Sequence, residues 1–179
     1  MKTSADLPGE ADSERLPLKF TPSDLQHLKA AQGWIQLAVW DAANEELESI
    51  KPQLRAHPYV LKVRFGVYLA AKHFELAIAA ADALVRFRPE EPEGWIQRSF
   101  ALHEVERTAE AQEKLRPAAE KFPKEWQICY NLACYACQLG EMDEARALLE
   151  RAFTLGDAKQ VKLMALDDPD LSPLFNASN

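Results

Sequence analysis

A period of 34 residues runs through most of this chain and constrains its fold more than any other feature. Alanine recurs at this step, at Ala43, Ala77, Ala111 and Ala145. Three residues before these alanines stand Trp40, Phe74, Thr108 and Met142; four residues after them stand Leu47, Ala81, Leu115 and Leu149. Positions three or four residues apart lie on one face of an α-helix. The period therefore predicts a series of similar helices that pack against their neighbours through small and apolar side chains.

Prolines divide the same stretch into repeating units. Pro89 and Pro123 have the 34-residue spacing and are expected to close helices, while Pro58 and Pro92 have it too and are expected to open the next ones. We divide the chain into units 24–57, 58–91, 92–125 and 126–159, each with two helices of about 14 residues around a tight turn. Gly140 lies in the turn of the last unit. A hairpin cannot bury its apolar face alone, so the units are expected to stack into a right-handed superhelix.

The two ends of the chain differ from the repeats. Residues 1–20 lack an apolar period and are expected to form a flexible tail. Thr21 is expected to cap a first helix, with Pro22 in its first turn and Asp24 at the positive end of its dipole, so that one domain spans residues 21–175. Residues 157–175 are expected to form a cap, in which Asp157 starts a helix and later leucines fold back onto the last hairpin. Residues 176–179 are a second tail.

Composition excludes several classes of function. The chain of 179 residues has a formal net charge of −7 and no cluster of lysine and arginine, so binding to nucleic acid or to an anionic membrane is not expected. No run approaches the roughly 18 apolar residues of a membrane-spanning helix, and the N-terminus lacks the apolar core of a secretory signal. The three cysteines are an odd number and indicate thiols in a reducing cytosol. We therefore expect a cytoplasmic protein.

The fourth unit resembles the consensus of the tetratricopeptide repeat family, from Asn131-Leu132-Ala133 through Gly140-Glu141-Met142-Asp143-Glu144-Ala145 to Ala152. The second and third units resemble it through Tyr68, Phe74, Ala77, Pro89, Trp95, Ala111, Ala118 and Pro123. The first keeps Trp34, Trp40 and Ala43 but has Arg55 where proline is usual, and Arg64 and Arg98 stand where leucine is usual. The resemblance covers residues 24–159 and implies an all-α fold, a right-handed α-solenoid of four helix-turn-helix units with a C-terminal capping helix.

In this family the first helices of the units line a concave groove that binds partner proteins, and the resemblance carries that groove to specific positions here. The groove positions are Leu25, Leu28, Gln32, Tyr59, Lys62, Gly66, Ile96, Phe100, His103, Tyr130, Cys134 and Cys137. They are mostly apolar and aromatic, which suits an amphipathic helix or an extended apolar peptide. The resemblance therefore implies a protein-interaction module or scaffold, with no cofactor and no catalytic residue.

One group within the family binds acidic chaperone tails through a clamp of lysine, asparagine and arginine. The matching positions here are Leu28, Gln32, Val63, Glu93 and Gln97. Because the clamp residues are missing, we predict that this chain does not bind such tails.

Three alternatives remain open at the level of sequence. His103, Cys134 and Cys137 could converge on a small metal site, although cysteine in a helix is more commonly a small buried residue. Redox chemistry at this Cys-x-x-Cys pair is disfavoured because the pair lies late in its helix, where the dipole raises a thiol pKa. The chain could instead form a homodimer through its apolar groove or edge, and a variant of this idea places Leu16 to Phe20 in the groove. No arrangement of nucleophile and base points to an enzyme.

Overall fold

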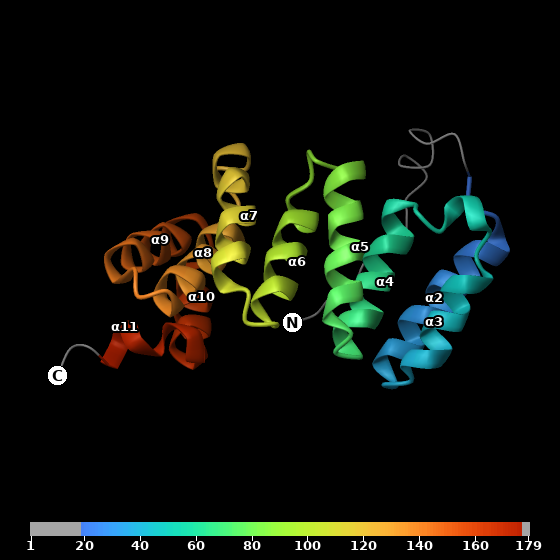
Figure 1. The fold of residues 1–179 in the computed structure, drawn as a ribbon, viewed down its shortest axis with the longest axis horizontal. Helices are drawn as coiled ribbons and strands as arrows, with labels where there is room; N and C mark the ends of the chain where they lie inside the picture. Colours follow the sequence, from blue (N-terminus) through green and yellow to red (C-terminus); the bar gives the residue numbers. More distant parts are fainter. Residues whose placement is uncertain (1–18, 177–179) are drawn as a thin grey trace. The chain divides into compact units, whose positions relative to one another are not determined.

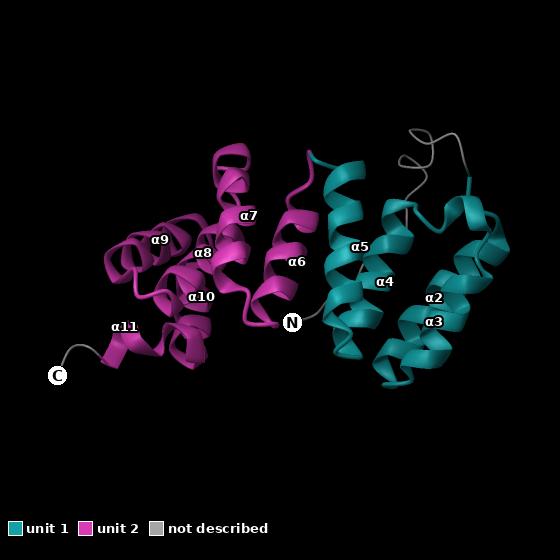
Figure 2. Cartoon of the chain, viewed as in Figure 1, with its two compact units in different colours: residues 1–89 teal, residues 90–179 magenta. Residues whose placement is uncertain are grey.

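The computed structural model describes residues 19–176, and in this part of the chain every regular element is a helix, without a strand (Figure 1). The predicted all-α fold is confirmed. Two compact units divide the chain, unit 1 with residues 1–89 and unit 2 with residues 90–179 (Figure 2). Most of the predicted tails, residues 1–18 and 177–179, lie outside the described residues. None of the helices between residues 19 and 176 has the length and apolar character that crossing a bilayer requires.

Unit 1 consists of two helical hairpins. The first pairs α2 (Pro22–Gln36) with α3 (Trp40–Ser49), and the second pairs α4 (Pro58–Ala70) with α5 (Phe74–Phe87); the 3-10 turn η1 (Pro52–Leu54) joins them. Helix α2 begins as predicted, with Thr21 as N-cap and Pro22 in the first turn. Asp24 completes a capping box, because its carboxylate accepts from the backbone N–H of Thr21 (2.8 Å) while its own backbone N–H donates to the Thr21 hydroxyl (3.3 Å). The same carboxylate also accepts from the backbone N–H of Lys51 (3.3 Å).

Unit 2 contains two further hairpins and a C-terminal extension. The hairpins are α6 (Pro92–His103) with α7 (Thr108–Lys121) and α8 (Trp126–Gln138) with α9 (Met142–Leu155). The extension consists of α10 (Ala158–Asp167), the 3-10 turn η2 (Pro169–Leu171) and the short helix α11 (Ser172–Asn176). Asp157 caps α10 by accepting from the backbone N–H groups of Lys159 and Gln160, so the predicted capping helix is present.

The helices keep the period of the sequence. Helices α4, α6 and α8 begin at residues 58, 92 and 126, and α5, α7 and α9 begin at residues 74, 108 and 142. The four alanines of the repeat, Ala43, Ala77, Ala111 and Ala145, are all 0% exposed. A small side chain at this position lets the two helices of each hairpin approach closely, and a buried leucine or alanine one turn later extends the contact.

The turns inside the hairpins repeat with the same period. The residues in the left-handed region are Ala38 (φ 57°), Lys72 (φ 58°), Glu106 (φ 61°) and Gly140 (φ 81°). Only the last of these four positions has the residue that adopts a positive φ without strain. The sequence therefore indicates this turn conformation at Gly140 alone, although the backbone uses it in every hairpin.

The first hairpin departs from the others at its second helix, which has 10 residues where about 14 were expected. Helix α3 ends at Ser49, and the chain is extended at Ile50 (ψ 143°) before the turn at Pro52. Pro52 disfavours helical backbone at Lys51, so α3 cannot run on through this proline, and the extended residue Ile50 lies one position before Lys51. Arg55 satisfies the freed end of α3, because its guanidinium donates to the carbonyl oxygens of Ile50 (3.0 Å) and Glu48.

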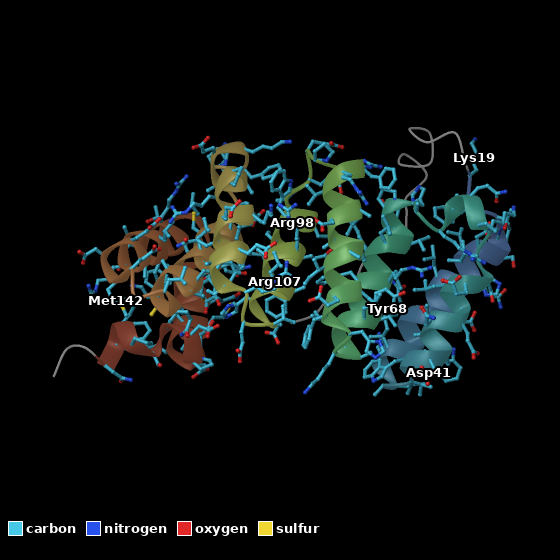
Figure 3. All side chains as sticks on the ribbon, in the orientation of Figure 1. Lys19, Asp41, Tyr68, Arg98, Arg107 and Met142 are labelled. Atoms are coloured by element: carbon cyan, nitrogen blue, oxygen red, sulfur yellow. The ribbon has the colours of Figure 1, made fainter. Side chains whose placement is uncertain are left out.

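Arg64 and Arg98, which replace the usual leucines, do not shift their hairpins, because α4 and α6 start in register. Arg64 donates from Nη1 to Glu48 Oε1 at 2.7 Å, which ties α4 to α3. Arg98, labelled in Figure 3, donates to the backbone carbonyl of Lys114 on α7 at 3.0 Å and lies over the ring of Trp95. Each long side chain therefore reaches polar partners at the edge of the packed interface.

Candidate functional site

The groove positions of unit 1 lie on α2 and α4, and most of them are half-buried. Leu28 is 1% exposed and belongs to the core of unit 1. Tyr59 stacks on the ring of His57, with 5.6 Å between centroids, and Lys62 Nζ lies 5.8 Å from the centre of the Tyr59 ring. The half-buried positions are Leu25, Gln32, Tyr59, Lys62 and Gly66. This part of the predicted groove therefore presents an aromatic, a cationic and a small residue at its surface.

The groove positions of unit 2 fall into two groups. Ile96, Phe100 and His103 on α6 are half-buried. The positions on α8 are covered, since Tyr130, Cys134 and Cys137 are 6%, 5% and 2% exposed. The cover is the chain itself: residues 168–174, which include η2 and the start of α11 and which we call the C-terminal segment, contact α8 and α9.

Asp168 binds the middle of α8. The Tyr130 hydroxyl donates to Asp168 Oδ2 at 2.8 Å, and Cys134 Sγ lies 3.7 Å from the same oxygen. The other carboxylate oxygen of Asp168 accepts from the backbone N–H of Asp170 at 3.0 Å and so caps η2. One carboxylate therefore both shapes the turn of the C-terminal segment and attaches that turn to α8.

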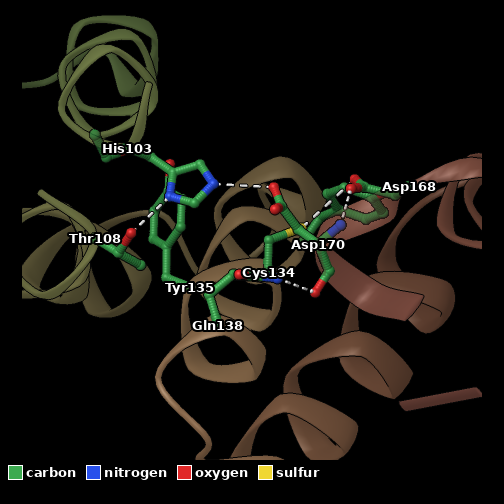
Figure 4. Close-up of polar contacts among 9 residues, drawn as sticks. His103, Thr108, Cys134, Tyr135, Gln138, Asp168 and Asp170 are labelled. Atoms are coloured by element: carbon green, nitrogen blue, oxygen red, sulfur yellow. Dashed lines mark hydrogen bonds and ion pairs between the residues drawn. The ribbon is translucent and has the colours of Figure 1, made fainter. Parts of the chain in front are cut away.

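Asp170 binds α6 and the end of α8 (Figure 4). His103 Nε2 lies 2.9 Å from Asp170 Oδ2, and His103 Nδ1 lies 2.9 Å from the hydroxyl of Thr108 at the start of α7. An ionised carboxylate only accepts, so Nε2 is the nitrogen that donates to Asp170. Gln138 Nε2 donates to the backbone carbonyl of Asp170 at 2.9 Å. Side chains from two helices thus converge on one residue of the C-terminal segment.

Leucines provide the apolar half of this contact. Leu171 is 0% exposed and Leu174 is 7% exposed, so both side chains are removed from water. The backbone of Leu174 hydrogen-bonds to Cys137. The predicted folding back of Leu171 and Leu174 is confirmed, whereas Phe175 remains 42% exposed.

Burial and the two aspartates keep the groups on α8 neutral. Burial raises the pKa of the Tyr130 hydroxyl, and its hydrogen bond to Asp168 raises this pKa further. Burial, followed by the nearby charge of Asp168, likewise raises the pKa of the Cys134 thiol, and burial also raises the pKa of Cys137. The side chains that face the C-terminal segment from α8 are therefore protonated donors at neutral pH.

The metal alternative finds no support in this geometry. Within residues 19–176, no group of three or more histidine, cysteine, aspartate or glutamate side chains is arranged to hold a metal ion. His103 already uses both ring nitrogens, in contacts with Thr108 and Asp170.

Sequence reasoning did not place Asp168, Asp170 and Gln138 at the groove. The two aspartates flank Pro169, and that pattern indicates a helix end, which is one of the roles of Asp168. Nothing local in the sequence indicates that the same carboxylates reach back across residue separations of 38 and 67 to Tyr130 and His103. The one available signal is chemical: an acidic turn beside leucines follows the capping helix α10, and hydrogen-bond donors stand at the groove positions.

No family model and no curated protein matches the chain. Solved structures do. MamA from residue 41 onward, of Desulfovibrio magneticus RS-1, is 12% identical, with a TM-score of 0.67 over 88% of this chain and 92% of that one. YrrB, described as a TPR protein with an unusual peptide-binding site, is 16% identical (TM-score 0.64; 81% and 75% covered). TTC0263, a thermophilic TPR protein of Thermus thermophilus, is 19% identical (TM-score 0.62; 86% and 82% covered). At these identities the likeness shows the fold alone.

Proposed function

Because the chain has the tetratricopeptide-repeat fold, we propose that it is a protein-interaction module that binds a peptide or helical segment of a partner on the first helices of its hairpins, which are α2 and α4 in unit 1 and α6 and α8 in unit 2, each unit taken by itself. Catalysis forms no part of the proposal. We also propose a reducing compartment such as the cytoplasm, because the three cysteines are an odd number in a chain large enough to fold without disulfides.

One observation carries the proposal: in unit 2 the first helices already bind a stretch of polypeptide. Side chains of α6 and α8 hold the C-terminal segment through hydrogen bonds to carboxylates and to a backbone carbonyl, and two leucines add apolar contact. Surfaces that bind peptides use the same combination of backbone contacts for affinity and side-chain contacts for specificity. The half-buried Ile96 and Phe100 lie on α6 as well, at the register of Tyr130 and Cys134 on α8.

Peptide selection tests this proposal directly. A library of random peptides is selected on the full chain, and the enriched peptides are titrated into wild type, Phe100→Ala and Phe87→Ala. Phe100 lies on a first helix, while Phe87 is an equally large ring, 55% exposed, on the second helix α5. We expect about a tenfold loss of affinity or more for Phe100→Ala and little change for Phe87→Ala. Unchanged binding by Phe100→Ala, or no enriched peptide at all, contradicts the proposal.

Self-association is a second candidate, favoured by the exposed face of α10. Leu163, Met164 and Leu166 are 55%, 42% and 64% exposed on this helix, while Val161 and Ala165 face the packed interior. Large exposed apolar clusters commonly mark interfaces. Light scattering at rising concentration compares wild type with the double variant Leu163→Lys/Leu166→Lys. A dimer in wild type that the variant loses supports this candidate, and a monomer in both removes it.

A further inference from the structure

We propose that the C-terminal segment is an internal ligand of unit 2, and that the partner bound by α6 and α8 is an acidic peptide that displaces this segment. Such a peptide has two aspartates two residues apart, followed by leucines. The segment itself reads Asp168-Pro169-Asp170-Leu171, with a second leucine at Leu174. This inference deepens the proposed function, because it names the partner's chemistry and adds a competition within the chain.

The receptor side consists of four side chains from two helices. His103 on α6 and Tyr130, Cys134 and Gln138 on α8 all contact the aspartates of the C-terminal segment. None of the four is lysine or arginine, so they recognise carboxylates by directed hydrogen bonds more than by net positive charge. Recognition of this kind differs from the carboxylate clamp of the family, whose residues the chain lacks.

The two aspartates of the C-terminal segment have different binding partners. Asp168 sits between two donors of α8, and Asp170 meets the imidazole of α6, so the spacing of the carboxylates matches the spacing of the helices. The contact to Gln138 uses only the backbone carbonyl of Asp170 and therefore accepts any residue type there. Leu171 and Leu174 are buried, and the elements that carry them, η2 and α11, contact α8 and α9.

The same contacts are open to a peptide supplied by another protein. The C-terminal segment comes after α10 and ends in the five-residue helix α11, so no part of the α6/α7 or α8/α9 hairpin has to be broken for it to leave. Its Asp170 side chain is 32% exposed and therefore meets solvent even when bound. Because the segment is tethered, its effective concentration is on the order of millimolar, and a peptide in trans binds only as well as this competition permits.

The test measures whether α6 and α8 bind an added peptide more tightly once the contacts of the chain's own C-terminal segment have been weakened. The probe is a fluorescein-labelled peptide with the sequence of residues 166–176, titrated by anisotropy into full-length wild type and Asp168→Ala/Asp170→Ala. The matched control is Asp143→Ala/Asp167→Ala, which removes the same charge from two exposed positions. We expect the first variant to bind the probe at least about tenfold more tightly than wild type and the control to equal wild type. We call Asp168→Ala/Asp170→Ala the open variant. Its binding of the probe is expected to weaken when both aspartates of the probe are replaced by alanine, and also when Tyr130→Phe is added to the protein.

Hydrogen exchange of the wild-type chain provides a second measurement that does not depend on the variant's folding. We expect the amides of residues 168–176 to exchange through openings that leave α8 protected, and saturating probe to speed their exchange. Equal binding of the probe by the open variant and wild type overturns the inference, as does exchange of the segment only together with α8. The proposed function survives that result if library peptides still require Phe100, so the two failures are distinguishable.

Discussion

Every hairpin turn contains one residue with a left-handed backbone. Replacing that residue is expected to raise the stability of the protein at some of these positions and to lower it at another. At Lys72 and Glu106, with φ values of 58° and 61°, an L-residue adopts a conformation that costs about 1–2 kcal/mol. Glycine removes that cost but adds about 0.5–1 kcal/mol of conformational entropy lost on folding. Lys72→Gly and Glu106→Gly are therefore expected to stabilise the protein by about 0.5–1 kcal/mol each, since both side chains are exposed.

Gly140 is the reverse case. A Cβ atom added there would meet nothing within 4 Å, so Gly140→Ala adds backbone strain without a clash and is expected to cost about 1 kcal/mol. Gly33 is the matched control: its Cβ would also meet nothing within 4 Å, but it lies inside helix α2, where alanine is expected to gain about 0.5–1 kcal/mol.

Thermal unfolding followed by circular dichroism measures these differences. For a chain of this size, 1 kcal/mol corresponds to a shift of about 2–4 °C in the midpoint. Gly140→Ala and Gly33→Ala are expected to move the midpoint in opposite directions, although both make the same chemical change. A higher midpoint for Gly140→Ala, or a lower one for Glu106→Gly, refutes the reasoning that the turn is strained wherever glycine is absent.

Further changes test the ends of helices and one close contact. Burial alone would raise the pKa of the Asp24 carboxyl, but its hydrogen bonds to Thr21 and Lys51 hold this pKa below the ordinary value. The ionised carboxylate therefore stabilises the folded protein above about pH 4, and this stabilisation is lost as the pH falls through the lower pKa of the folded state. Between pH 5 and pH 2, the melting temperature of Asp24→Ala is expected to fall less than that of wild type. Gly156→Ala places a Cβ 3.0 Å from the ring of Trp126 and is expected to cost about 1–3 kcal/mol in urea unfolding; a cost near zero would contradict the packing. Arg55→Ala uncaps α3 and is expected to cost about 1 kcal/mol by the same assay, while the exposed control Arg146→Ala costs almost nothing.

Much of the fold follows from the sequence because a repeat is local information copied several times. The 34-residue period specifies where α4 to α9 begin, and the alanines at 0% exposure occupy the close contacts that the pattern predicts. The pattern gave no sign that α3 ends at Ser49, although Pro52 carries the physical reason. Where a single unit lacks the usual residue, the sequence offers no second copy from which to infer the local backbone.

The candidate site was less predictable for a different reason. The groove positions come from the resemblance to the family, which indicates the face of a helix that a residue occupies but not what covers that face. Tyr130 and Cys134 stand at the predicted positions, yet they contact Asp168, whose place in space depends on how α10 and η2 turn the chain. Such contacts between distant residues carry no period, so pattern reasoning could not predict them.

Because the cysteines are buried, the rate at which their thiols are alkylated reports how often the segments that cover them move away. Cys134 and Cys137 lie under the C-terminal segment, whereas Cys129, although 2% exposed, has Arg151 and Glu125 as its charged neighbours. Alkylation by a thiol reagent at the first two positions is then limited by departure of the segment, while Cys129 serves as an internal reference for loosening of the hairpin. Mass spectrometry of the labelled chain would time that departure in the native protein, with no dye and no introduced residue.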